Sequence, residues 1–513
     1  MKINQRKAGV ILSYLFTVVN AVVGFLYIPL IIYFIGQDQY GLYQLFGSIL
    51  IYLGLFDFGL GKTVTRYYSK YMALGDEKSK ENLLGISSVI FLVLSLFLLI
   101  IGTIIYPYLE SFFGKSLTVE EILMAEKMYL VVLFTAIITV LTSVFKAVIT
   151  AYERFIFLKG IMLVQVLLRP IVVLAVFLIE SNAFILIVIQ AFLNIGMIIA
   201  MIYYSFKKLK IKIKLHYWDS SLLKELVRFS FFIFITAVVD QIFWRADQII
   251  LGSFVGTTSV AIYSIGSQLL MYYMTLSTAM SGVFLPNITK RVTQNASDKD
   301  LTDIFIKIGR LQYLLLGAVL IGFIVFGKDF ISLWVGEDFK NSYYITLLIL
   351  LPFTIDLIQN IGLAILQAKN MYGFRAITFL IMAIANIIIS IPLAILYGGI
   401  GTAIATGVCF LIGNGVVMNL YYYKKVGIDV ISFWKEIAKL SLPMLLSLAI
   451  GMMINYINYI NIDILAFFIN ISLFSVIYFI IIWFVSLNSY EKNIIKSPLN
   501  KIIKLKKEKK NSD

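Results

Sequence analysis

Charged side chains within long apolar runs are the first candidates for chemistry in this chain. Arg169, followed by Pro170, lies near the middle of one run, and Asp57 lies near the end of another. An ionisable group at mid-membrane costs at least about 2.5 kcal/mol, so it normally faces a cavity or a partner. Pro170 lacks a backbone donor and frees a carbonyl one turn back, which can solvate the guanidinium. We expect Arg169 to face a substrate cavity or, alternatively, to pair with Asp57.

Other cationic side chains lie at the ends of apolar runs or within them. Lys62 and Arg66 are four residues apart and share a helix face, and Lys146 lies near the inner end of its run. Such groups can bind an anionic ligand at a cavity mouth, or they can snorkel to lipid headgroups. The predicted substrate-binding set is Arg169, Arg66, Lys62, Lys146 and Arg245.

Acidic side chains gather in a later run. Asp240 and Asp247 are seven residues apart, and on a 3.6-residue helix they fall within about 20° of each other, whereas Arg245 is turned about 140° from Asp240. A carboxylate at mid-depth without a cation beside it on the same helix suits H⁺ or Na⁺ coordination, or a salt bridge across a seam between lobes. The predicted cation-coupling or seam-pairing set is Asp240, Asp247, Asp356, Asn386 and Asn20.

The composition defines the environment of these side chains. Of 513 residues, 60% are apolar and 14% are charged, and the mean hydropathy is +0.93; soluble chains carry about 25% charged residues. A soluble enzyme, a disordered chain and a disulfide scaffold are therefore excluded. A single cysteine and a single histidine argue against a disulfide and a zinc site. No Walker A sequence is present, which argues against an ATP-driven pump.

Fourteen apolar runs between residues 9 and 487 are long enough to cross a bilayer, which predicts an all-α polytopic membrane protein. With the N-terminus inside, 35 of the 43 Lys and Arg residues fall in inner segments and three in outer loops. This asymmetry predicts cytoplasmic termini and excludes a nucleic-acid-binding face. The basic tail, residues 488–513, is expected to touch anionic lipids. The abundance of Ile, Lys and Asn indicates an AT-rich bacterial genome and a cytoplasmic membrane.

An internal repeat divides the runs into two lobes. The segment from Gly36 to Tyr43 matches the segment from Gly256 to Tyr263 at an offset of 220, and later landmarks match at 217. Six spans per unit predict parallel lobes and alternating access by rocking. The predicted parts are an N-lobe over 1–206, a linker over 207–224, a C-lobe over 225–423, two further spans over 424–487 and the tail.

Several segments resemble the Wzx-type polysaccharide repeat-unit flippases, which transport glycans for O-antigen and capsule. They are Tyr27-Ile-Pro-Leu-Ile-Ile-Tyr-Phe-Ile-Gly36, Tyr40-Gly-Leu-Tyr43, Asp57-Phe-Gly-Leu-Gly61 with Thr65-Arg66-Tyr67, and Arg245-Ala-Asp-Gln-Ile-Ile-Leu-Gly252 with Tyr263. These flippases belong to the multidrug/oligosaccharidyl-lipid/polysaccharide exporters, together with MATE antiporters and lipid II flippases. The resemblance implies a MATE-like fold and translocation of undecaprenyl-diphosphate-linked oligosaccharide to the outer leaflet. It also implies that Arg66 and Arg169 hold the diphosphate, and that Asp240 and Asn386 form a cation site.

Two alternatives remain open at this level. A MATE-like cation-coupled drug antiporter would use the acidic residues to bind organic cations. A membrane polymerase or ligase would need a sizeable outer loop, and the outer loops are short, so we expect no enzyme and no cofactor beyond coupling H⁺ or Na⁺. For the flippase, the expected partners are the lipid-linked oligosaccharide and membrane lipids, with a polysaccharide polymerase and a chain-length regulator as further candidates.

Overall fold

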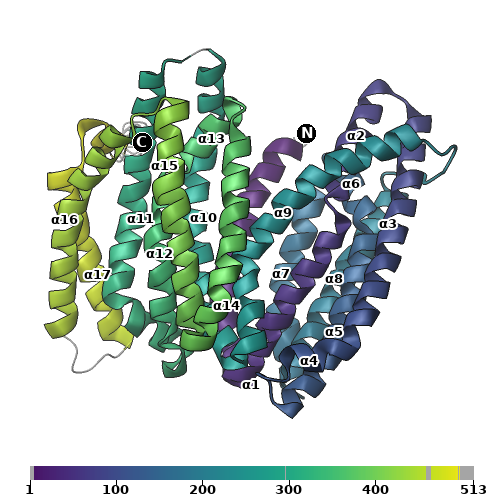
Figure 1. Cartoon of the computed structure of the whole chain (residues 1–513), viewed down its shortest axis with the longest axis horizontal. Helices are drawn as coiled ribbons and strands as arrows, with labels where there is room; N and C mark the ends of the chain where they lie inside the picture. The colour runs from purple at the N-terminus through teal and green to yellow at the C-terminus, as the bar shows by residue number, and fades with distance from the viewer. Residues whose placement is uncertain (1–4, 295, 458–463, 495, 497–513) are drawn as a thin grey trace, which may run out of the picture. The chain divides into compact units, whose positions relative to one another are not determined.

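The chain is helical throughout the part that the computed structural model describes, residues 5–294, 296–457, 464–494 and 496 (Figure 1). Most of the predicted lipid-binding tail, from residue 497 on, lies outside the described residues. The α-helices are α1 (Gln5–Gly54), α2 (Leu60–Leu74), α3 (Glu77–Ile105), α4 (Leu109–Phe113), α5 (Val119–Leu141), α6 (Ser143–Ala151), α7 (Phe155–Phe177), α8 (Ala183–Lys207), α9 (Ser220–Phe254), α10 (Thr257–Thr293), α11 (Asp298–Val335), α12 (Ser342–Ile358), α13 (Ile361–Ala368), α14 (Tyr372–Phe410), α15 (Asn419–Tyr421), α16 (Val430–Ile457) and α17 (Ile464–Ile481).

Eleven described segments are long and apolar enough to cross a membrane, compared with fourteen predicted spans. Two of the eleven, Ala8–Leu74 and Tyr372–Val426, have 67 and 55 residues, and each contains a break at a glycine with positive φ, Gly36 (75°) or Gly398 (58°). Glycine adopts a positive φ without a Cβ penalty, and because these residues are non-helical each segment can hold two spans. The predicted eighth span corresponds to α10, which is not among these eleven described segments.

Helix ends extend beyond the apolar runs. The ninth run predicts a span over 311–327, bounded by Arg310 and Lys328, whereas α11 continues from Asp298 to Val335. The helix continues because backbone hydrogen bonding does not require apolar side chains, and Arg310 is buried in an ion cluster. Interruptions also occur within spans, at Thr142 between α5 and α6 and at Gln359 between α12 and α13, and these two positions are 217 residues apart.

The first packing unit comprises Met1–Ile265 with Ala383–Thr402. Within it α1 packs against α5, α7, α8 and α9, and α2 packs against α3, α6 and α9. Figure 1 shows α9 running beside α2. A buried cluster of Ile149, Leu158, Ile198 and Met201 joins α6, α7 and α8. These contacts fix the helices that carry most of the predicted site residues.

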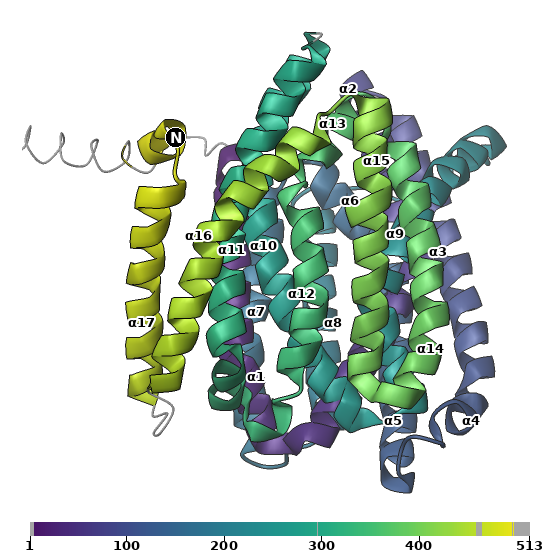
Figure 2. The same ribbon diagram turned by 60° about the vertical axis from the view of Figure 1, so that its left-hand side comes forward.

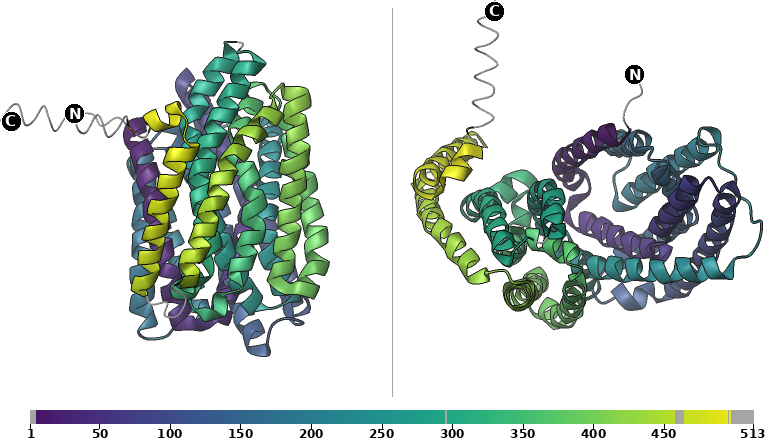
Figure 3. Two further views of the ribbon diagram at one scale, coloured as in Figure 1. Left: turned by 90° about the vertical axis from the view of Figure 1, so that its left-hand side faces the viewer. Right: turned by 90° about the horizontal axis from the view of Figure 1, so that it is seen from above.

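The second unit comprises Gly266–Met382 with Ala403–Asp513. Here α11 packs against α12, α16 and α17, and the last two helices form an antiparallel pair (Figures 2 and 3). Its core includes Val325, Phe326 and Phe474. The predicted division into a six-span N-lobe, a six-span C-lobe and two appended spans differs from these two units in its boundaries and stays a prediction.

Candidate functional site

A cavity of about 440 Å³ lies within the first unit, among the helices that carry Lys62 and Lys146. We call it the lysine cavity. Its lining combines charged, hydroxyl and apolar side chains from the end of α1, from α2, from the two halves of the fourth span and from α8. The lining residues are Gly54, Asp57, Gly61, Lys62, Thr65, Thr139, Val140, Thr142, Ser143, Lys146, Ala147, Thr150, Asn194, Met197, Ile198 and Met201.

A break in the second span positions Asp57 in this cavity. A 3₁₀ turn over Leu55–Asp57 ends α1, and Phe58 (φ 49°) and Gly59 (φ 73°) adopt left-handed conformations before α2 begins. The Gly59 N–H donates to Asp57 Oδ1 at 2.7 Å, which satisfies a backbone donor at the break. The Phe58 ring packs 4.5 Å from that of Phe234, which supports a conformation that is unusual for a bulky residue. The carboxylate is therefore held at a fixed point of the wall.

The lysines of the cavity carry exposed ammonium groups. Among the described residues, neither Lys62 nor Lys146 has an acidic oxygen within 4.0 Å of its Nζ atom. The hydroxyl groups nearby are already committed as donors to backbone carbonyls, for example Thr142 to Ile138 at 2.6 Å. The cavity therefore offers cationic donors for an anion and hydroxyl oxygens that can accept hydrogen bonds from a ligand.

A second cavity, of about 240 Å³, shares Gly54, Thr139 and Asn194 with the lysine cavity. We call it the glutamine cavity because Gln165 and Gln190 also line it. The shared residues make the two cavities neighbours within one helix bundle. Two of the shared residues, Thr139 and Asn194, are polar.

Gln190 connects the second cavity to Arg169. The Arg169 guanidinium donates to the Tyr43 hydroxyl and to Gln190 Oε1, the latter at 3.2 Å, and the Tyr43 hydroxyl donates to the same Gln190 oxygen at 2.9 Å. The central carbon of the Arg169 guanidinium lies 5.0 Å from the centre of the Tyr27 ring, within cation–π range. The hydrogen bonds of Arg169 thus go to neutral groups, and its predicted alternative partner, Asp57, lies at the lysine cavity.

The structure brings Asp247 and Asn386 together in the first unit. Asp247 is 2% exposed and accepts hydrogen bonds from the Tyr263 hydroxyl at 2.5 Å and the Ser390 hydroxyl at 3.0 Å. The Ser390 hydroxyl also lies 3.2 Å from Asn386 Oδ1. A buried carboxylate with oxygen-bearing neighbours from two other helices can take up a proton or a small cation.

The other predicted site residues differ in their exposure and contacts. Arg66 is exposed on α2 with its guanidinium 4.4 Å from the Phe229 ring centre, and Arg245 lies 3.4 Å from Gln248 Oε1. Asp240 is exposed on α9 and Asn20 on α1. Asp356, in the second unit, accepts from Arg375 at 3.2 Å. The cation site of Asp240 and Asn386, which the resemblance implies, stays a prediction.

Sequence reasoning named no role for the uncharged partners Tyr43, Gln190, Tyr263 and Ser390. Charge in an apolar run is a visible signal, whereas a hydroxyl or amide that orients the charge is not. The repeat nevertheless singles out Tyr43 and Tyr263, since both are landmarks of its 220-residue offset. Their burial, at 6% and 4% exposure, fits their position against the charged groups.

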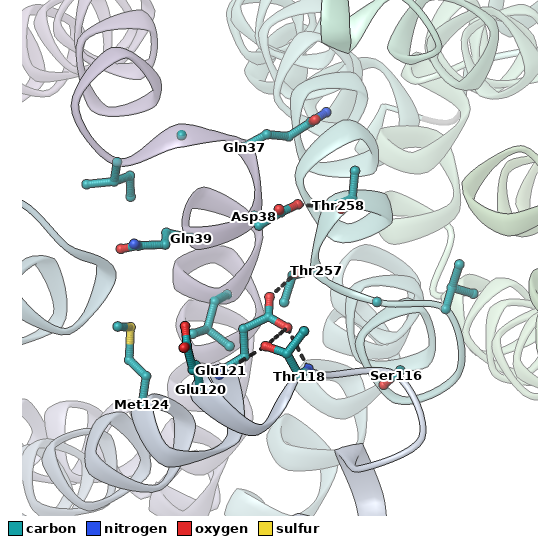
Figure 4. Close-up of a pocket in the computed structure, with 15 residues that line it drawn as sticks. Gln37, Asp38, Gln39, Ser116, Thr118, Glu120, Glu121, Met124, Thr257 and Thr258 are labelled. Atoms are coloured by element: carbon teal, nitrogen blue, oxygen red, sulfur yellow. Dashed lines mark hydrogen bonds between the residues drawn. The ribbon is translucent and has the colours of Figure 1, made fainter.

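A third cavity, of about 520 Å³, lies where the two repeat landmarks meet (Figure 4). Asp38 accepts a hydrogen bond from Thr258, its equivalent at the 220-residue offset, and Glu121 Oε1 accepts from Thr257 at 2.5 Å. The described lining includes Asp38, Glu120 and Glu121 but no Lys or Arg. It is therefore ill suited to an anionic ligand.

The fold defines a class. The structure matches that of a lipid II flippase, MurJ, with a TM-score of 0.71 and 19% identity over 96% of this chain and 99% of that one. It also matches a multidrug resistance MATE family transporter, with a TM-score of 0.63 and 15% identity over 80% of this chain and 96% of that one. The protein therefore has the MATE-like fold of multi-pass membrane transporters, as predicted.

The family follows from the sequence. The profile of the Polysaccharide biosynthesis protein family matches residues 7–292, more than half of the chain, and the chain belongs to that family. It is 21% identical over 199 residues to the probable low-salt glycan biosynthesis flippase Agl15 of Haloferax volcanii. That match covers 39% of this chain and 42% of the relative, so the chain spans less than half of the relative's length. The chain is therefore a member of a polysaccharide biosynthesis family with the MATE-like membrane fold.

Proposed function

We propose that this protein is a flippase that moves an undecaprenyl-diphosphate-linked oligosaccharide repeat unit from the inner to the outer leaflet of a bacterial cytoplasmic membrane. The observation that carries the proposal is the lysine cavity, in which two ammonium groups lie beside acceptor oxygens within a bundle of membrane-spanning helices. A charged headgroup cannot cross hydrocarbon without a polar, cationic path because its desolvation cost is too high.

The lining of the two cavities suits the chemistry of such a headgroup. Lys62 and Lys146 would bind the diphosphate, with Arg66 as a further cation on α2, and sugar hydroxyls would donate to the threonine oxygens. The glutamine cavity leads towards Arg169, which retains N–H donors beyond its two neutral partners. The polyprenyl tail would stay in lipid while the headgroup moves by alternating access, with both termini on the cytoplasmic side. A polymerase and a chain-length regulator would take the product on the outer side, for an O-antigen, a capsule or a related glycan.

The sidedness of the lipid-linked intermediates tests this function. In a strain that lacks the gene, intermediates should accumulate and stay protected from a membrane-impermeant sugar-modifying reagent on intact spheroplasts. Restoring the gene should make them accessible. Equal accessibility with and without the gene would refute the flippase function.

A cation-coupled antiporter is the second candidate, and buried Asp247 favours it. A carboxylate hydrogen-bonded to Tyr263 and Ser390 could exchange a proton or Na⁺ against a cationic drug. The same carboxylate would serve a flippase as its coupling site, with Arg245 two residues before it on α9. Drug efflux from cells that express the protein, together with unchanged glycan sidedness, would favour the antiporter.

A further inference from the structure

We propose that Asp57 is a built-in counter-charge that repels the diphosphate of the substrate while Lys62 and Lys146 bind it, and so sets how readily the headgroup is released. This inference rests on the proposed function and concerns the same site. Asp57 would be a specificity-determining residue, since its charge would lower the affinity for the diphosphate across the cavity.

The geometry fixes the carboxylate in the site. Its Oδ1 atom is held by the Gly59 N–H at 2.7 Å, and a Cβ atom added at Gly61 would lie 3.6 Å from Oδ2. Asp57 and Gly61 both line the lysine cavity. One oxygen is thus used to close the helix break, while the other lies along the wall that it shares with Gly61. The turn residues Phe58 and Gly59 prevent the carboxylate from swinging away with α2.

The charges that line the cavity allow Asp57 to repel an anion that the two lysines bind. The described lining carries two cations, Lys62 and Lys146, and one anion, Asp57. Neither lysine forms an ion pair with Asp57 or any other described acid within 4.0 Å, so both ammonium groups can reach an incoming anion. A diphosphate held by the lysines would feel the repulsion of Asp57 across the cavity, and the affinity would fall accordingly.

The hydroxyl groups of the cavity contribute little to anion binding, so the affinity for a diphosphate depends on the charged residues. Their hydrogens are donated to backbone carbonyls: Thr65 to Gly61 at 2.9 Å, Thr142 to Ile138 at 2.6 Å, Ser143 to Thr139 at 2.9 Å and Thr150 to Lys146 at 2.8 Å. An anion would therefore find its strongest donors in the lysines. A transported group must bind tightly enough to enter a site and weakly enough to leave it. Asp57 lowers the affinity for the diphosphate and so favours its release.

The test compares Asp57→Asn with a matched variant, Asp76→Asn. Each substitution removes one negative charge, and in both cases asparagine keeps the oxygen that accepts a hydrogen bond from a backbone N–H, from Gly59 for Asp57 and from Ser79 for Asp76. Asp76 caps α3 and is not among the lining residues of the cavity. Geranyl diphosphate, a short polyprenyl diphosphate, is the probe, and its binding to the purified full-length protein in nanodiscs is measured at low and at high salt.

We expect Asp57→Asn to bind geranyl diphosphate roughly three- to tenfold more tightly at low salt, with a smaller gain at high salt, because screening weakens the repulsion. Asp76→Asn should bind like the wild type, and Lys62→Gln/Lys146→Gln should abolish the gain. Asp57→Ser, which also removes the charge but keeps a short acceptor, repeats the test if the asparagine variant does not fold. Unchanged or weaker binding by a folded, uncharged variant would overturn the role of Asp57.

The binding test and the sidedness test can fail separately. Tighter diphosphate binding by Asp57→Asn together with unaltered glycan sidedness in the strain without the gene would retain the counter-charge and reject the flippase function. Normal flipping by the wild type with no effect of Asp57→Asn on binding would retain the flippase function and reject the counter-charge. In an active flippase, Asp57→Asn should also slow turnover, since a more tightly held headgroup leaves later.

Discussion

Tyr43 and Tyr263 are 220 residues apart, and each hydroxyl group binds a charged side chain of opposite sign. The hydroxyl of Tyr43 accepts a hydrogen bond from Arg169, whereas that of Tyr263 donates to Asp247 at 2.5 Å. A hydroxyl can do both, so the same landmark of the repeat serves a cation in one place and an anion in the other. Tyr27, whose ring lies beside Arg169, is also 220 residues before Asp247. The two tyrosines of the predicted repeat thus bind side chains of opposite charge.

The first prediction concerns Arg169. Arg169→Ala should abolish export of the glycan while the protein still inserts into the membrane, because its partners Tyr43 and Gln190 are neutral and lose no counter-ion. Arg169→Lys should retain part of the activity, since lysine keeps the charge but not the planar donor fork. The measurement is surface glycan per membrane-inserted protein. Normal surface glycan in Arg169→Ala would remove Arg169 from the mechanism.

The second prediction concerns ion coupling. Asp247→Asn should abolish any dependence of transport on a proton or Na⁺ gradient, because the buried carboxylate is the group that the Tyr263 and Ser390 hydroxyls surround. Asp240→Asn, an exposed position on the same helix, is the matched control and should keep that dependence. Transport is measured in proteoliposomes with imposed gradients. If Asp240→Asn abolished the dependence and Asp247→Asn kept it, Asp240 and not Asp247 would be the coupling residue.

The third prediction concerns stability of the second unit. Arg310 is 6% exposed and donates to Glu491 at 2.8 Å and to Glu436 at 2.8 Å, which ties α11 to α16 and to the segment after α17. Arg310→Ala should destabilise the unit by about 3–5 kcal/mol, since it leaves buried Glu491 without its cation. Lys439→Ala, which removes an exposed partner of Glu436, should change little. Thermal unfolding in detergent compares the two, and equal midpoints would contradict the buried cluster.

The fourth prediction concerns the break at Gly36, which interrupts α1. Gly36 has φ 75° with open space around its Cα, so Gly36→Ala should cost about 1–2 kcal/mol through backbone strain alone. Gly36→Asn should cost a similar amount, because φ 75° with ψ 176° lies in a region that is essentially restricted to glycine and outside the left-handed helical region that asparagine tolerates. Gly47→Ala, at a helical position with equally open space, serves as the control and should not destabilise. A thermal midpoint of Gly36→Ala at or above that of Gly47→Ala would contradict the turn.

The architecture could be predicted because the bilayer dictates it. Long apolar runs, basic residues gathered in one set of loops and the repeat at Gly36 and Gly256 predict an all-helical membrane protein, and the resemblance to Wzx-type flippases implies its MATE-like fold. Interruptions within the helices escaped prediction. The break at Phe58 and Gly59 lies inside an apolar run, and the bulky Phe58 gives no sign of a positive φ.

The candidate site could be predicted only in part, for a related reason. Charge in a membrane-spanning run identifies Lys62, Lys146, Arg169 and Asp247 from the sequence. It does not show which charges meet, because this depends on helix rotation and on neutral side chains such as Gln190 and Ser390. From the sequence, Asp57 is an alternative partner of Arg169, and the resemblance pairs Asp240 with Asn386. The structure adds neutral partners that the sequence does not reveal: Gln190 contacts Arg169, and Ser390 links Asp247 to Asn386.

The most direct test of the flippase function is reconstitution. Purified protein is placed in liposomes with undecaprenyl-diphosphate-linked oligosaccharide, and an impermeant sugar-modifying reagent reports how much of the inner-leaflet pool becomes accessible over time. We expect the wild type to expose that pool and Lys62→Gln/Lys146→Gln to leave it as protected as empty liposomes do. A wild-type protein that leaves the inner pool protected, or a double variant as active as the wild type, would contradict the proposal that this protein flips its substrate through the lysine cavity.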